Sequence, residues 1–315
     1  MRLYRTPLRT GVLAVCVAVS LAHAPAGTAG EAVFGYIYTT DLLPKGKSEW
    51  EQWITDRRGQ AYSRFDDFKL RTEYEYGITD NLQLGGYLNY SYLWARGNSV
   101  RHVTEGLDVP WNHDAGQSYR GARFDGVSAE LVWRVLSPFK HPIGLAFYLE
   151  PAFGSRERGL EFRTIVQKNL LDDRLVLAAN LMVEAEKERG SNLVDPGMPD
   201  DMPDSSRHKA TYAEIDLGAS YRFASHWSAG LELRNHNEFD GYSLAHSHQN
   251  HSAFFLGPNL HYGGKRWFFT LSALRQVHAT TYTRQQADQM HSGMLFGDEH
   301  TQWDGLRLKV GYSFE

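Results

Sequence analysis

The chain has 315 residues, of which 42% are hydrophobic, 13% aromatic and 22% charged, and its formal net charge is −4 at pH 7. A mean hydropathy of −0.46 argues against a bundle of membrane-spanning helices, each of which needs about 20 consecutive apolar residues. A single Cys excludes a disulfide framework and a cysteine-based zinc site. No nucleic-acid partner is expected, because Lys and Arg form no cluster.

Residues 1–29 are predicted to be a secretory signal peptide. Three Arg precede the apolar run Gly11–Ala22, and small residues follow it. The run is short for a membrane anchor, so cleavage near Ala29 is favoured over an uncleaved anchor. Cleavage would remove the three Arg and Cys16, leaving 30 basic and 37 acidic residues. The mature chain is therefore expected to be an exported protein without cysteine.

The rest of the chain alternates apolar and polar residues with a period of two, which is the signal of β-strands. About twelve strands are predicted, in the order Glu49–Thr55, Phe68–Ile78, Leu82–Trp94, Val127–Val135, Ile143–Phe153, Leu160–Val166, Leu175–Ala185, Ala213–Phe223, Trp227–Leu233, Phe254–Tyr262, Trp267–Ala273 and Leu306–Phe314. Val33–Thr40 can be read as another strand or as a lead-in on the lumen side, so fourteen strands stay possible.

Three features favour a membrane barrel over a soluble sandwich. Most predicted strands have about 10 residues or more, the length that crosses a bilayer at a tilt. Trp94, Trp133, Trp227 and Trp267 stand at strand ends, where aromatic girdles form. Short and long connections alternate. Because lipid offers no hydrogen-bond partner to an open sheet edge, the expected fold is all-β, a closed antiparallel transmembrane β-barrel.

The connections assign the two sides of the membrane. Short turns fall on one side, which is assigned to the periplasm: 77–81, 136–142, 168–174, 224–226 and 263–266. Long polar loops fall on the outer side: 95–120, 187–208 and 280–304. Connection 154–159 departs from this rule, because it is short and yet falls outside. The expected organisation is a signal peptide at 1–29, a periplasmic lead-in at 30–46 and the barrel at 47–315.

Four segments carry a resemblance to known proteins. Leu306–Phe314 resembles the C-terminal signal of Gram-negative outer-membrane proteins, which the barrel-assembly machinery reads, although Glu315 follows its final aromatic residue. Pro44-Lys-Gly-Lys47, Glu73-Tyr-Glu-Tyr-Gly-Ile-Thr-Asp80 and Gly257-Pro-Asn-Leu-His-Tyr262 are similar to a family of proteobacterial outer-membrane barrels of unknown function. The resemblance implies the cell outer membrane as location, with its lipid and lipopolysaccharide as surroundings. It implies no reaction and no catalytic residue.

Positions between the lipid-facing ones are predicted to face the lumen. This candidate pore lining consists of Lys69, Arg71, Glu73, Glu75, Glu130, Arg134, Glu150, Glu161, Arg163, Glu184, Glu186, Glu214, Asp216, Arg222, Glu232, Arg234, His236, Arg307 and Lys309. Twelve strands at ordinary spacing and tilt enclose a backbone radius of roughly 12 Å, so the lumen is expected to be narrow and of mixed charge. The charges are interpreted either as cross-strand ion pairs that hold the wall or as the lining of a solute path.

A His-rich stretch, 236–252, supports two further hypotheses. It contains the residue types of a serine hydrolase, but so would any His-rich outer loop. His246 and His248 would share one face of an extended strand with His251 nearby, a set that suits Zn²⁺ or Cu²⁺. The acidic stretch 195–204 does not have the spacing of an EF-hand calcium loop and is interpreted as a solvated loop.

The favoured function is a passive pore or channel for small polar solutes, without a cofactor. Acidic residues on successive strands, namely Glu184, Glu186, Glu214, Asp216 and Glu232, predict a mild cation preference. The second hypothesis is a non-conducting barrel that acts as a structural or surface-interaction protein through its outer loops. An outer-membrane hydrolase or a metal-binding barrel is the third.

Overall fold

The computed structural model describes residues 32–59, 64–96, 118–189, 206–284, 287 and 301–314. The predicted signal peptide, the acidic stretch 195–204 and most of the outer loops 95–120 and 280–304 lie outside the described residues. Among the residues that are described, no helix is long and apolar enough to cross a membrane.

Twelve strands form the structure, as the alternation predicts. They are β1 Ser48–Arg58, β2 Arg64–Thr79, β3 Leu82–Arg96, β4 Ser118–Leu136, β5 Gly144–Phe153, β6 Glu157–Leu170, β7 Leu175–Arg189, β8 Arg207–Ala224, β9 Trp227–Asp240, β10 Gln249–Gly263, β11 Trp267–Thr281 and β12 Trp303–Phe314. Several run well beyond the predicted bounds at their outer ends, where the sequence is polar on both faces and the alternation fades.

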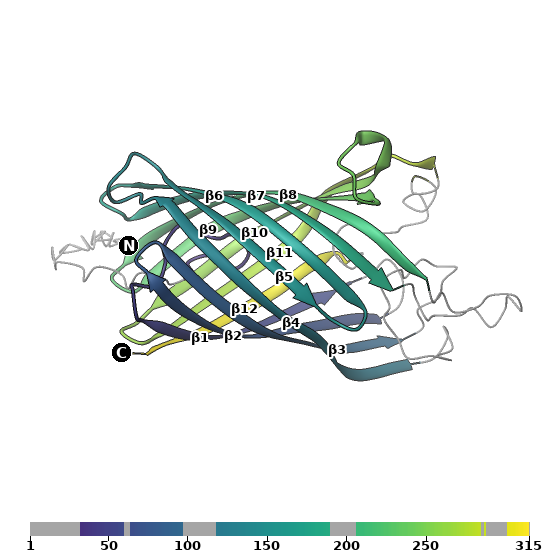
Figure 1. Cartoon of the computed structure of the whole chain (residues 1–315), viewed down its shortest axis with the longest axis horizontal. Helices are drawn as coiled ribbons and strands as arrows, with labels where there is room; N and C mark the ends of the chain where they lie inside the picture. The colour runs from purple at the N-terminus through teal and green to yellow at the C-terminus, as the bar shows by residue number, and fades with distance from the viewer. Residues whose placement is uncertain are drawn as a thin grey trace, which may run out of the picture.

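The strands close into one antiparallel barrel, in which each strand pairs with its neighbours in sequence and β1 pairs with β12 (Figure 1). Ser48 of β1 lies opposite Phe314 of β12 on one side and opposite Tyr76 of β2 on the other. No described strand therefore has an open edge, which is the condition for a sheet in lipid. The prediction of a closed transmembrane-type β-barrel with twelve strands is confirmed.

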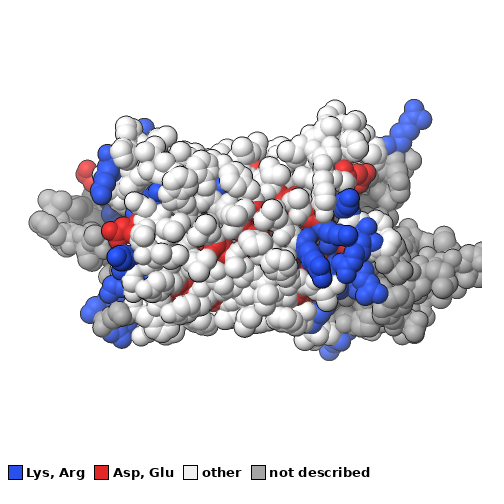
Figure 2. All heavy atoms as spheres, viewed as in Figure 1, with Lys and Arg blue, Asp and Glu red and all other residues white. Residues whose placement is uncertain are grey.

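The outer wall is apolar. Outward positions of the strands carry exposed large side chains such as Leu84, Leu131, Leu217 and Leu271. Lys and Arg gather at the two ends of the molecule, while the band between them is almost free of them (Figure 2). Trp133, at the short-turn end of β4, is 53% exposed, as expected for an aromatic residue at the level of the lipid headgroups.

The connections follow the predicted alternation. β2–β3 and β8–β9 are joined by tight turns at one end, and β6–β7 by a turn in which Leu171, Asp172 and Asp173 have positive φ. The connection between β5 and β6 is short on the opposite side, as the sequence indicated. The β9–β10 connection contains the 3-10 turn His246–His248.

Candidate functional site: the lumen

Residues 32–47 precede β1 and form no strand: residues 32–43 lie inside the barrel, buried or partly buried, and residues 44–47 are exposed at the short-turn end. This segment is called the inner segment below. It leads into β1 at Ser48, and in Figure 1 it is the purple trace enclosed by the strands near the short-turn end. The lumen-side lead-in was one of the two alternatives for Val33–Thr40, and wall side chains enclose these residues. Sequence patterning alone could not separate the two alternatives, because a segment inside a wet barrel needs no regular periodicity.

Side chains of the wall hold the main chain of the inner segment. Asn180 of β7 accepts a hydrogen bond from Tyr38 N at 2.8 Å and donates one to Tyr38 O at 2.9 Å. Gln167 of β6 accepts one from Thr40 N at 2.7 Å. Two further wall acceptors act in the same way: Gln83 of β3 binds Leu43 N at 2.9 Å, and Glu232 of β9 binds Gly35 N and Tyr36 N, each at 2.8 Å.

Two arginines hold carbonyl groups of the inner segment. Arg307 of β12 donates to Gly35 O at 3.1 Å, and Arg134 of β4 donates to Thr40 O at 3.2 Å. The chain therefore reaches the wall through side chains on widely separated strands. Backbone-to-backbone hydrogen bonds with the wall appear at its C-terminal end, where Gly46 N donates to Gly77 O at 2.8 Å and Gly77 N donates to Lys47 O at 2.9 Å.

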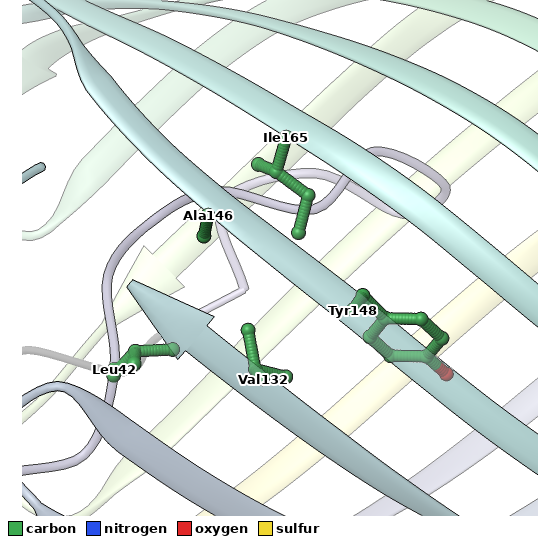
Figure 3. Close-up of a cluster of buried hydrophobic side chains, with 5 residues drawn as sticks. All are labelled: Leu42, Val132, Ala146, Tyr148 and Ile165. Atoms are coloured by element: carbon green, nitrogen blue, oxygen red, sulfur yellow. The ribbon is translucent and has the colours of Figure 1, made fainter. Parts of the chain in front are cut away.

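Apolar side chains of the inner segment fill pockets of the inner wall. Leu42 packs against Val132, Ala146, Tyr148 and Ile165 of β4, β5 and β6 (Figure 3). Phe34 and Ile37 pack with Ala178 of the adjacent strand β7, and Tyr36 packs with Ala253, Phe255 and Leu274 of β10 and β11. Together these contacts run around the lumen from β4 to β11.

Small residues of the wall make room for the inner segment. A Cβ at Gly218 of β8 would lie 2.7 Å from Ile37 Cδ1 and 2.8 Å from Phe34 Cε1. A Cβ at Gly144 of β5 would contact the side chain of Thr40. Real Cβ atoms do not approach so closely, so the wall at these two positions is shaped to the segment that it encloses.

Burial changes the titration of three groups in the inner segment. Removal from water raises the pKa of the Tyr36 and Tyr38 hydroxyls, so both stay protonated. Burial also raises the pKa of the Asp41 carboxyl, and the hydrogen bond from Gln167 and the charge of Arg134 oppose this effect. Gln167 Nε2 donates to Asp41 Oδ2 at 3.0 Å.

Ion pairs fill the next level of the lumen, farther from the short-turn end. Arg163 of β6 lies 2.9 Å from Glu161 and 3.2 Å from Asp216 of β8. Arg234 of β9 donates to Glu214 Oε2 at 3.0 Å and also binds Asp304 of β12. These arginines reach across neighbouring or distant strands, so they stiffen the wall and narrow the bore at once.

The structure places the predicted lumen residues on the inner wall. Glu73, Glu75, Glu130, Glu150, Arg163, Glu186, Glu214, Asp216, Glu232, Arg234, His236 and Lys309 are buried inside the barrel, and Lys69, Arg71, Arg134, Glu161, Glu184, Arg222 and Arg307 are partly buried. Arg71 binds Glu150 across the lumen, and Arg134 reaches Thr40 O. Arg222 stands at the short-turn end, where its backbone N donates to Arg174 O at 2.7 Å.

The residues that hold the inner segment were largely missed from the sequence. Gln83, Gln167 and Asn180 occupy inward strand positions, but they are uncharged and so do not belong to the predicted charged lining. Their signal was an amide at a lumen position close to a short turn. Asp304, which binds Arg234, lies on β12, whereas the prediction assigned it to the outer loop 280–304.

The His-rich stretch does not bring its three imidazoles together as a cluster. His246 and His248 lie exposed on a 3-10 turn rather than on the extended strand that was expected. His251 is 1% exposed on β10, with its Nε2 3.7 Å from Glu238 Oε2. Within the described part of the chain, groups of three possible metal ligands with atoms within 4.8 Å of one another consist of glutamates.

Comparisons with known proteins place this barrel. A family model matches residues 26–314, most of the chain. The chain belongs to the family of unknown function DUF6662. No curated protein matches the sequence. The resemblance to an outer-membrane barrel family of unknown function is thereby confirmed.

Solved structures share the architecture at low identity. The COG4313 outer membrane channel from Pseudomonas putida F1 has a TM-score of 0.54 and 11% identity, over 87% of this chain and 97% of that chain. The beta domain of the Bordetella autotransporter BrkA has a TM-score of 0.49 and 12% identity, over 86% and 100%. The KdgM porin has a TM-score of 0.41 and 12% identity, over 85% and 99%. The first of these likenesses shows the fold, that of an outer-membrane barrel.

Proposed function

We propose that the protein is an outer-membrane channel for small polar solutes, whose lumen the inner segment closes at rest. The single observation that carries the proposal is that the barrel closes without the segment. β1 pairs with β2 and β12 along its length, and residues 32–43 are held by wall side chains. The segment can therefore leave without breaking a strand pair.

Withdrawal of the segment would clear the lumen at the level near the short-turn end. Twelve strands enclose a backbone radius of roughly 12 Å, and the inner segment now takes up the width between Gln83 and Asn180, on separate parts of the wall. Each hydrogen bond lost costs about 1 kcal/mol net, and water that enters the lumen replaces it. Pro44–Lys47 would stay bound through Gly77 and act as the hinge.

The likeness to a protein described as an outer membrane channel supports this function. An exported chain whose signal peptide is removed would reach that membrane, and Leu306–Phe314 would present the strand that the barrel-assembly machinery reads. Wall charges of both signs support weak selectivity, with a mild cation preference from the acidic residues of β7, β8 and β9.

Planar-bilayer recordings of the refolded mature chain test the proposal. The full chain is expected to be mostly closed, and a variant lacking residues 32–43 is expected to conduct continuously with a reversal potential that favours cations. As a length-matched control, replacement of residues 32–43 by Gly and Ser should conduct nearly as much, because it lacks the apolar anchors.

A reversible lock makes the test sharper. A Cβ at Gly144 lies against the Thr40 side chain, so Thr40→Cys with Gly144→Cys can form a bridge, and the mature chain is predicted to have no other cysteine. The oxidised variant should carry no current, and reduction should restore openings, which should be more frequent than in the unmodified chain because the Cβ at position 144 crowds residue 40. A folded barrel without residues 32–43 that carries no current would overturn the channel in favour of the non-conducting barrel, which the densely filled lumen also supports.

A further inference from the structure

Five glutamates cover one patch of the inner wall beside the inner segment. Glu49 lies opposite Glu75, and Glu51 lies opposite Glu73, on β1 and β2. Gly85 of β3 lies opposite Glu75 on one side and opposite Glu130 of β4 on the other. Because Gly85 has no side chain, Glu130 can lie over it; a Cβ at Gly85 would be 2.6 Å from Glu130 Cγ.

The patch is almost inaccessible to water. Glu73 and Glu130 are each 1% exposed, and the Oε1 atom of each is buried with no hydrogen-bond partner. Neutral groups occupy other oxygens of the patch: Gln83 donates to Glu75 at 2.7 Å and Tyr87 donates to Glu130. These donors leave the Oε1 atoms of Glu73 and Glu130 buried without a hydrogen-bond partner.

Two basic side chains of the described residues lie near the patch. Lys309 of β12 interacts with Glu51. Arg71 lies close as well, but its guanidinium binds Glu150 and Asn89. Buried carboxylates are costly unless a cation or a hydrogen-bond donor compensates them, so the patch needs either further positive charge or protons.

The spacing suits a cation. The ligand oxygens of Glu73, Glu75 and Glu130 lie within 4.8 Å of one another, and so do those of Glu49, Glu51 and Glu75. Ca²⁺ binds oxygen at about 2.3–2.6 Å, so ligands on opposite sides of the ion are about 5 Å apart. Either group can therefore contact one ion without movement of the backbone.

We propose that Glu73, Glu75 and Glu130 form a binding site for a hard divalent cation such as Ca²⁺, with Glu49 and Glu51 beside it. An all-oxygen, strongly acidic donor set selects Ca²⁺ or Mn²⁺ over the softer metals. The orphaned oxygens of Glu73 and Glu130 supply the ligands that lack any other partner. This site does not depend on whether the barrel conducts.

The cation would also support the closed state. Gln83 donates to Glu75 and accepts from Leu43 N, so one side chain joins the site to the inner segment. An ion on Glu75 fixes the orientation of this amide. Removal of the ion is therefore expected to loosen the segment near its hinge.

Calorimetric titration of Ca²⁺ into the refolded mature protein, stripped with EDTA and free of lipopolysaccharide, tests the site. Saturable binding is expected, and Glu73→Gln with Glu130→Gln should weaken it about tenfold or more, because two charged ligands are lost. Glu157→Gln, an exposed carboxyl group on β6, is the control and should leave affinity unchanged. The double variant also separates this site from acidic outer loops, which it leaves intact.

Mn²⁺ paramagnetic resonance of the unmodified protein gives a readout that needs no variant. Bound Mn²⁺ should lose the six-line signal of the free ion at neutral pH and regain it as protons compete at low pH. If Ca²⁺ binding is absent, or equal in the double variant and the unmodified protein, the carboxyl groups are held by protons and the proposal is overturned.

Discussion

Two levels of the same lumen are filled in different ways. Near the short-turn end, uncharged side chains such as Asn180 and Gln167 hold the main chain of the inner segment. Farther along, Arg163 and Arg234 bind carboxylates of the wall itself. The first level is held by wall side chains rather than by strand pairing, whereas the second consists of ion pairs of the wall itself. In the channel that we propose, closure of the bore and stability of the barrel would therefore be separable properties.

Loss of an ion pair of the wall should reduce the stability of the barrel more than any other change considered below. Arg163→Met should lower the free energy of unfolding by about 3–5 kcal/mol, because the buried Asp216 and the partly buried Glu161 lose their cation. Urea unfolding in lipid vesicles measures it. Combination with Asp216→Leu should recover part of the loss. Equal stability of the single variant and the unmodified barrel would mean that water already solvates this level.

Glu232 joins the inner segment to the wall, so its replacement should affect both. Its carboxylate is 0% exposed and accepts from Gly35 N, Tyr36 N, Ser272 Oγ and Asn259 Nδ2. Glu232→Ala leaves these donors without their acceptor, so docking of the segment should weaken by about 2–4 kcal/mol. The ratio of open to closed time in planar bilayers should rise at least tenfold. An unchanged ratio would count against the segment as the closing element.

Gly218 provides a steric version of the same test. Gly218→Val should place atoms where Ile37 and Phe34 now lie and disfavour docking by about 1–3 kcal/mol. Ala219→Val, one position along β8 and on the opposite face, is the matched control and should leave the open fraction unchanged. Equal currents in the two variants would show that the wall does not need this space.

Replacement of Asp41 should have the weakest effect, which is on the pH dependence of the open fraction. Burial raises the pKa of Asp41, which lies among Gln167, Arg134 and Asp173. A carboxyl group whose pKa is raised on docking stabilises the docked state below its ordinary pKa, and this contribution is lost as pH rises through the raised value. Asp41→Asn should reduce the increase in open fraction on going from acidic to neutral pH. A pH profile identical to that of the unmodified chain would remove Asp41 from the mechanism.

The period-two alternation was sufficient to predict the wall. Leu82–Trp94 alternates so strictly that its two faces could be assigned residue by residue, and β3 spans Leu82–Arg96. Prediction failed for His246–His248, because a two-residue His spacing suits a strand or a turn equally well, and the local backbone decided for a 3-10 turn.

The alternation of apolar and polar residues was enough to predict a barrel with an apolar exterior and a charged interior. That information is local, because neighbouring residues along a strand point to opposite faces and lipid requires every edge to be paired. The inner segment and the side chains that hold it in the interior could be identified only from the folded barrel. Three pairs lie close in space but far apart in the sequence: Tyr38 with Asn180, Gly35 with Glu232, and Glu130 with Glu73. The period-two pattern shows which side chains point inward, but not which of them come together when the sheet closes.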